Sequence, residues 1–284
     1  MRAKNMWLWL PIAAFIAGAG ALQVLRLADR RNDDEIVTRL KSLSTRDRVF
    51  SEKQIAGLPE PVHRFFKFSI KEGTPLYQWV DLRMEGQLSL GSKVSPRYMQ
   101  MRADQVLAAQ HGFIWRPAMR SGLMRLSGSD GYYDGQGWTR FWLWSLIPIV
   151  RAGGSADFAK SAAARGIAEA VFWLPTALLP SAHIRWEAVD EDTARVVVGD
   201  NGARYAVDIK VASDGHPIQT MFQRWSRENP DKVWRYQPFG ATVEKTRAFG
   251  GLRIASEVRA GNNFGTADYF PFYIATITEA HYGL

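Results

Sequence analysis

From Tyr77 onward, short segments in which apolar and polar residues alternate are separated by tight-turn sequences, and this rhythm most constrains the fold. The segment 79–90, WVDLRMEGQLSL, places Val80, Leu82 and Met84 on one side, and a period of two is typical of a half-buried strand. Separators such as Asp214-Gly215 and residues 200–202, DNG, favour two-residue hairpins. Consecutive hairpins form an antiparallel meander, so the sequence predicts a mainly β protein built on one large sheet.

Residues 153–180, GGSADFAKSAAARGIAEAVFWLPTALLP, break this rhythm because they are rich in alanine and poor in β-branched residues. Ser155 suits an N-cap, so we expect a helix over 156–173 that ends near Pro175. A shorter helix is expected within 58–70, LPEPVHRFFKFSI. The predicted architecture is a curved antiparallel sheet, or half-barrel, that encloses one helical segment.

The first residues predict a transmembrane helix ahead of this sheet. Met6 to Leu25 contain no charged residue, and twenty helical residues span about 30 Å, the hydrocarbon thickness of a bilayer. Small residues at 17–21 also allow a cleaved signal peptide, although the apolar run is longer than usual for one. The expected organisation is an anchor or signal peptide over 1–28, a helical linker over 29–54 and one folded domain over 55–284.

Composition and charge narrow the partners. The net charge is +8 and 46% of the residues are hydrophobic. The Lys and Arg residues are mostly scattered singly, which argues against nucleic-acid binding. This distribution fits attraction to anionic lipid head groups or a solvated strand face. Basic residues after the span favour a cytoplasmic domain. Long domains, however, translocate largely regardless of charge. We therefore expect a single-pass signal-anchor protein of a bacterial inner membrane, with its domain facing the periplasm or the cell exterior.

Two strongly apolar stretches flank the expected helical segment: 141–150, FWLWSLIPIV, and 169–180, EAVFWLPTALLP. Both are too short to cross a bilayer, which needs about 20 residues. They are either core segments covered on both faces or the aromatic wall of a cavity for an apolar ligand.

Several motifs resemble those of known bacterial proteins. LPEPVHRFFKFSI, GFIWRP, DGYYDGQG, the 169–179 segment and the C-terminal GGLRIASEV look like an uncharacterised family of membrane-anchored proteins, over roughly residues 55–282. More loosely, the pattern resembles exported half-barrels of the lipoprotein-carrier, LolA-like, type, in which a curved sheet shields an apolar cavity. That resemblance implies a lipid-binding fold and no particular reaction.

No arrangement of residues predicts a catalytic site, a metal site or a cofactor. The five histidines are far apart in the sequence and form no zinc-binding pair. The segment 130–137, DGYYDGQG, lacks the spacing of a calcium loop and reads as a turn. Glu169 is either a carboxylate beside apolar surface or the partner of Arg165 four residues earlier.

We therefore expect a membrane-anchored protein that binds a lipid, an acyl chain or another apolar ligand, with the membrane as a second partner. The expected ligand-binding residues are Trp115, Trp138, Trp142, Trp144, Phe172 and Trp173. Two alternatives stay open: an envelope enzyme that uses a carboxylate such as Glu169 or Asp134, and a structural or interaction module whose interior is filled by its own side chains.

Overall fold

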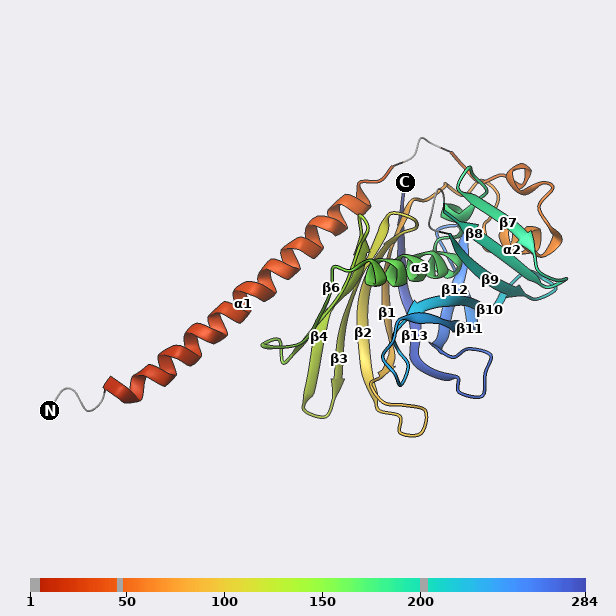
Figure 1. Ribbon diagram of the computed structural model, residues 1–284. Helices are drawn as coiled ribbons and strands as arrows, with labels where there is room; N and C mark the ends of the chain where they lie inside the picture. Colours follow the sequence, from red (N-terminus) through yellow and green to blue (C-terminus); the bar gives the residue numbers. More distant parts are fainter. Residues whose placement is uncertain (1–5, 45–47, 200–203) are drawn as a thin grey trace.

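The computed structural model describes residues 6–44, 48–199 and 204–284, without the side chains of residues 6–13 and 15. One large, open, curved antiparallel sheet dominates this part of the chain (Figure 1). Its strands are β1 (Trp79–Ser89), β2 (Tyr98–Ala108), β3 (Gly112–Ser121), β4 (Met124–Tyr133), β5 (Gln136–Leu143), β6 (Ile147–Gly153), β7 (Ile184–Ala188), β8 (Thr193–Val198), β9 (Tyr205–Val211), β10 (Pro217–Ser226), β11 (Arg235–Phe249), β12 (Leu252–Asn262) and β13 (Phe270–Gly283). The expected mainly β fold is confirmed.

The strands follow the order β6-β5-β4-β3-β2-β1-β13-β12-β11-β10-β9-β8-β7. Each run of hairpins, β1 to β6 and β7 to β13, pairs strands that follow one another in the chain, as the turn sequences predict. The first and last strands, β1 and β13, pair in the middle of the sheet. Strands β6 and β7 therefore form its two edges. The turn expected at 200–202 lies outside the described residues.

Helix α3 (Ala156–Trp173) and the short 3-10 helix η2 (Pro175–Leu178) connect these two edges across the concave, inner face of the sheet (Figure 1). The Ser155 side chain accepts a hydrogen bond from the Phe158 amide and caps the helix, so the expected helix over 156–173 is confirmed. The helix lies close to β5: a side chain added at Gly137 would place its Cβ 2.7 Å from the Phe158 carbonyl oxygen. Small residues thus allow the helix to lie within the curve of the sheet.

The second half of the sheet is covered by α2 (Glu60–Ser69), which follows the 3-10 helix η1 (Glu52–Ile55). Phe65 and Phe66 of α2 are fully buried, and their rings lie 5.7 and 5.1 Å from the ring of Trp186 in β7. The strand residues beneath them, such as Val196 and Ile209, are buried and alternate with half-buried or exposed residues. This alternation places the main core on the inner face.

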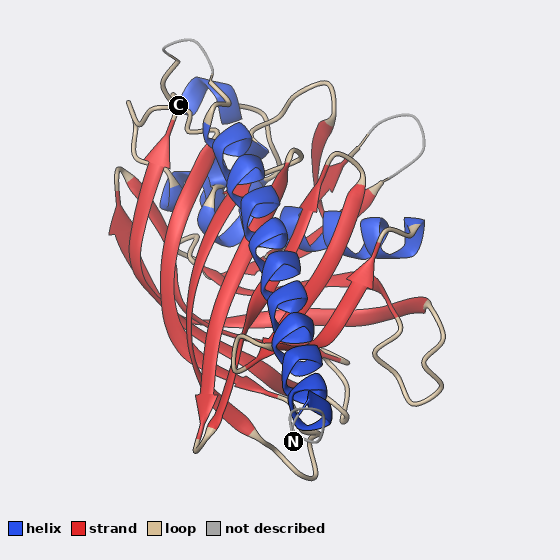
Figure 2. Cartoon of the chain, turned by 90° about the vertical axis from the view of Figure 1, so that its left-hand side faces the viewer, coloured by secondary structure: helices blue, strands red, loops and turns tan. Residues whose placement is uncertain are grey.

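Helix α1 (Met6–Lys41) runs along the convex, outer face of the sheet (Figure 2). Its Ile36 and Leu40 pack with Val106, Ile114 and Trp138 in a second, smaller apolar cluster. The helix is continuous through residue 28, where the sequence predicted the end of an anchor. Among the side chains that the structure describes, no helix is long and apolar enough to cross a membrane, and the expected transmembrane helix is not shown. The side chains of residues 6–13 and 15, within that segment, lie outside the description.

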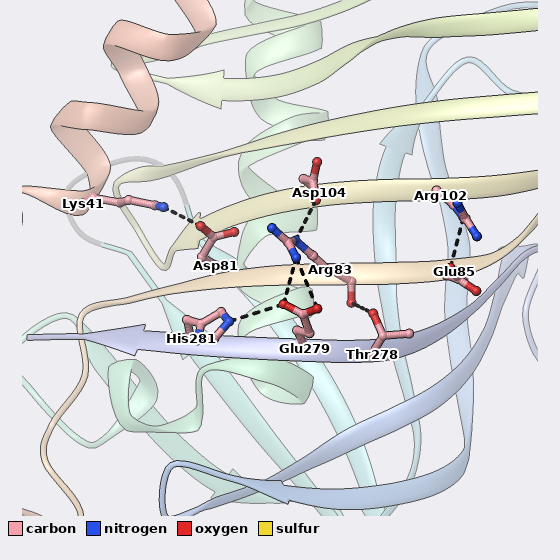
Figure 3. A network of polar contacts seen from close by, with 9 residues as sticks. All are labelled: Lys41, Asp81, Arg83, Glu85, Arg102, Asp104, Thr278, Glu279 and His281. Atoms are coloured by element: carbon pink, nitrogen blue, oxygen red, sulfur yellow. Dashed lines mark hydrogen bonds and ion pairs between the residues drawn. The ribbon is translucent and has the colours of Figure 1, made fainter.

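On the outer face, the centre of the sheet carries a ladder of opposite charges (Figure 3). Arg83 of β1 lies 3.1 Å from Glu279 of β13 and 3.7 Å from Asp104 of β2, while Lys41 at the end of α1 pairs with Asp81. Because most of these side chains are solvated, each pair contributes little to stability. Their position shows which face of β1, β2 and β13 meets water.

Candidate functional site

An open cleft of about 810 Å³ lies on the inner face between α3 and the sheet. Most of its wall is apolar or aromatic: Leu88, Trp115, Met119, Leu126, Phe141, Phe172, Trp173, Phe222, Phe239, Val258, Phe270 and Phe272. The loops after β1 and β12, including Lys93 and Asp268, line its outer end. The protein's own side chains therefore do not fill the interior. The alternative of a structural or interaction module required a filled interior.

A polar cluster closes the inner end of the cleft beneath α3. Arg165 donates from Nε to Glu169 Oε1 at 2.6 Å and from Nη1 to Asp130 Oδ2. Gln105 Nε2 donates to the other Glu169 oxygen at 2.5 Å, and Thr139 Oγ1 donates to Asp130 Oδ1 at 2.7 Å. Each oxygen of the two carboxylates thus has a hydrogen-bond partner within the cluster.

The electrostatics of the two arginines in this cluster differ. Burial alone would lower the pKa of Arg165, but the charges of Glu169 and Asp130 raise it above its ordinary value. Burial, and then the charge of Arg165, lower the pKa of Arg224. Arg224 forms no ion pair within the described chain; its Nε donates to Ser161 Oγ at 3.3 Å and its guanidinium lies 5.0 Å from the Phe239 ring centre. The terminal nitrogens of Arg224 are thus the cationic donors left available at the inner end.

Tyr273 adds a phenol to the same wall. Its hydroxyl lies 2.9 Å from the sulfur of Met84, and its ring lies edge-on to Trp115 with centroids 6.0 Å apart. Burial, followed by the charge of Glu169, raises the pKa of Tyr273 above its ordinary value, so it stays a neutral hydroxyl at physiological pH. The Tyr273 hydroxyl thus donates to Met84, and the inner end combines this neutral phenol with the cationic donors of Arg224 beside apolar walls.

The model of DUF6544, a family of unknown function, matches residues 48–274. The chain belongs to this family. The match covers α2, α3, the strands β1 to β12 and the first five residues of β13, so the residues that line the site lie within the family's shared region. Membership in an uncharacterised family, expected from the motifs, is confirmed. Among curated proteins, none matches this DUF6544 chain.

Solved structures similar to the DUF6544 chain include a DUF1329 family protein from Desulfovibrio piger, with 10% identity over 72% of this chain and 86% of that one and a TM-score of 0.42. A putative outer membrane lipoprotein-sorting protein domain from Vibrio parahaemolyticus has 11% identity, coverage of 72% and 85%, and a TM-score of 0.34. The LolA superfamily protein NE2245 from Nitrosomonas europaea has 11% identity, coverage of 71% and 84%, and a TM-score of 0.33. Structures of the lipoprotein-carrier type are thus among the matches, as the looser resemblance implied.

The residues predicted to bind a ligand divide into three groups. Trp115, Phe172 and Trp173 line the cleft. Trp138 and Trp142 alternate with Thr139 and Phe141 along β5 and face the outer side, where Trp138 packs with α1. Trp144 lies in the exposed turn between β5 and β6. The structure therefore brings only the first group together at the cleft.

The acids considered for catalysis are also separated. Glu169 lines the cleft, but both of its oxygens are held by Arg165 and Gln105. Asp134 is an exposed turn residue between β4 and β5 and does not line the cleft. No cluster of three or more possible metal ligands occurs in the residues that the structure describes.

The sequence reasoning missed Gln105, Asp130 and Arg224. Each is a polar residue at an inward-facing position of a strand. Apolar residues two positions away share that face, such as Leu107 next to Gln105 and Phe222 next to Arg224. A polar residue at a position that alternation assigns to the core is a signal that could have found them, because buried polar groups need partners.

Proposed function

We propose that this DUF6544 protein binds a hydrophobic ligand, such as a lipid or acyl chain, in the open cleft. The observation that carries the proposal is the cleft of about 810 Å³ with a mostly apolar wall, a size within the usual range of ligand pockets. Transfer of a chain from water to this wall supplies about 25 cal/mol per Å² of apolar surface buried. The terminal nitrogens of Arg224 provide donors for a polar group of the ligand.

A matched pair of variants tests this proposal. Ala260 is buried in β12 and lines the cleft, whereas Ala118 is exposed in β3. Ala260→Phe fills part of the cleft, so native mass spectrometry of the full chain from a bacterial host should show a lipid-sized adduct in the wild type and in Ala118→Phe but a reduced adduct in Ala260→Phe. Circular dichroism confirms that both variants are folded.

Two results would count against the proposal. Wild-type protein that shows no adduct, and no change in tryptophan emission when a fatty acid or phospholipid is added, does not bind such ligands. Equal adducts in folded Ala260→Phe and Ala118→Phe place the ligand somewhere other than the cleft.

We also propose that the uncharged segment 6–25 anchors the chain in a bacterial inner membrane, with the folded part on the periplasmic side. The composition of this segment supports the proposal. The chain contains no cysteine, so Val189→Cys provides one label site. A membrane-impermeant maleimide should label it before spheroplasts are lysed; labelling only after lysis would place the folded part in the cytoplasm.

A further inference from the structure

Two neighbouring hairpin turns expose large apolar side chains at one end of the sheet. Leu123 is 89% exposed and Met124 is 46% exposed at the β3–β4 turn, and Trp144 is 57% exposed and Ile147 is 43% exposed at the β5–β6 turn. We call these four residues the tip patch. Exposed apolar patches are a feature of interaction sites for proteins or membranes, so we ask which surface the tip patch contacts.

Hydrogen bonds join the two turns to each other and to α1. The Trp144 indole Nε1 donates to the Leu123 carbonyl at 3.0 Å, and the Trp144 amide donates to the Arg125 carbonyl at 2.8 Å. Gln23 Nε2 of α1 donates to the Ser145 carbonyl at 2.9 Å. The tip patch therefore sits beside the point on α1 where the run without charges, from Met6 to Leu25, leaves the sheet (Figures 1 and 2).

The backbone at Trp144 is unusual for a bulky residue. Trp144 and Ser145 have φ angles of 51° and 61°, and the Leu146 amide donates to the Leu143 carbonyl at 3.0 Å. Such a turn favours Asn-Gly, because a bulky residue is strained in the left-handed region. More than half of the Trp144 side chain is exposed, so packing does not account for its presence in a strained position.

The charges around the tip patch are of one sign. Residues 117–129 and 139–155 contain no Asp or Glu, whereas Arg120 and Arg125 are exposed beside the β3–β4 turn. Arg151 and Arg140 of the second hairpin lie close to Asp29 of α1, further from the turns. A surface that meets the tip patch therefore encounters exposed apolar groups surrounded by positive charge.

We propose that the tip patch docks on a lipid bilayer that carries anionic head groups. Tryptophan is favoured at the membrane interface because its ring is apolar and its N–H is polar, and exposed arginines are attracted to anionic lipids. The loop after β1, which lines the outer end of the cleft, lies at the same end of the sheet as these turns. Docking therefore brings the cleft entrance towards the membrane. This inference does not depend on a ligand in the cleft.

Depth-dependent quenching on the full chain tests the docking directly. Because the chain has no cysteine, Leu123→Cys carries one environment-sensitive fluorophore at the tip patch, and Val189→Cys carries the same label in the exposed β7–β8 turn at the other end of the sheet. With vesicles of phosphatidylglycerol and phosphatidylcholine that contain spin-labelled lipid, the label at 123 should shift to the blue and lose intensity. The label at 189 should change little. Equal quenching at both sites, or none at 123, overturns the proposal.

A second comparison separates docking from folding. Trp144→Asn suits the left-handed turn but loses the indole hydrogen bond to Leu123, so its thermal midpoint should stay close to that of the wild type, while quenching of the label at 123 falls. Arg120→Gln should also reduce quenching on anionic vesicles, whereas Arg185→Gln, an exposed position on β7, should not. If Trp144→Asn is folded and leaves quenching unchanged, the tip patch does not bind the membrane.

Discussion

At the scale of single residues, Arg165 is the most consequential side chain of the cleft, because it is mostly buried and bonds to both Asp130 and Glu169. Arg165→Met leaves two carboxylates without their cation, so we expect the free energy of unfolding to fall by about 3–5 kcal/mol. Urea unfolding at neutral pH measures this loss.

The control for Arg165 is the triple variant Arg165→Met, Asp130→Asn, Glu169→Gln, which removes the uncompensated charges and should recover part of the stability. If Arg165→Met alone is as stable as the wild type, the cluster does not hold α3 against the sheet.

The side chain of Asp33 should make the stability of the protein depend on pH. Asp33 of α1 is buried against the sheet, and burial raises its pKa above the ordinary value of 3.8, although Ser129 and Arg140 act in the opposite direction. Its protonated form is therefore favoured by folding, and this stabilisation is present at low pH and lost as the pH rises through the folded pKa. Asp33→Asn should gain stability relative to the wild type between acidic and neutral pH. A difference in unfolding free energy that shrinks over this range would contradict the assignment.

Alternation along β5 shows why the sequence identified only some of the site residues. It correctly places Trp138 and Trp142 on one face and Phe141 on the other, but it does not tell which face has the cleft. Both faces are covered near this strand, the inner one by α3 and the outer one by α1. Aromatic residues are therefore favoured on both, and the choice between them depends on tertiary packing.

At the scale of elements, α3 was predictable because its determinants are local: alanine-rich composition, an N-cap and a terminating proline. The boundary expected at residue 28 of α1 is not present, because no helix-breaking residue separates 6–28 from the part of the helix that packs on the sheet. Local preference in that segment favours one continuous helix.

The N-cap of α3 supports a prediction at this scale. Ser155→Ala removes the acceptor for the Phe158 amide, so the free energy of unfolding should fall by about 1 kcal/mol, whereas Ser155→Gly should cost only a few tenths. Chemical denaturation of both variants measures the difference. If Ser155→Ala is as stable as the wild type, the hydroxyl does not cap the helix.

At the scale of the whole molecule, the turn sequences predicted the hairpins but not the pairing of β1 with β13 in the middle of the sheet, which we call the central joint. Strand β1 pairs with β13 across nearly the whole folded chain, as in Leu82 opposite Ala280, and no local sequence signal specifies a pairing at such separation. The open cleft was likewise a property of the assembled sheet and not of any one segment.

Because the central joint connects the two halves of the sheet, we expect both halves to lose stability together. Ile277 of β13 is 1% exposed, and Ile277→Ala should cost about 2–5 kcal/mol because it leaves a cavity at the joint. Hydrogen exchange should show the same loss of protection in peptides from β2–β4 and from β8–β10, while Thr276→Ala, on the exposed side of β13, should show little. A loss confined to one half would mean that the halves unfold independently.

The central pairing of β1 with β13 also determines when the chain can fold during synthesis. A ribosome makes β13 after every other described strand, so β1 and β12 each present an open edge until that moment. Open edges of this kind are templates for aggregation, and non-local pairings form slowly. Once β12 has been made, the nascent chain therefore carries two half-sheets with open edges, and we expect its yield to depend on chaperones that shield those edges until the last strand emerges.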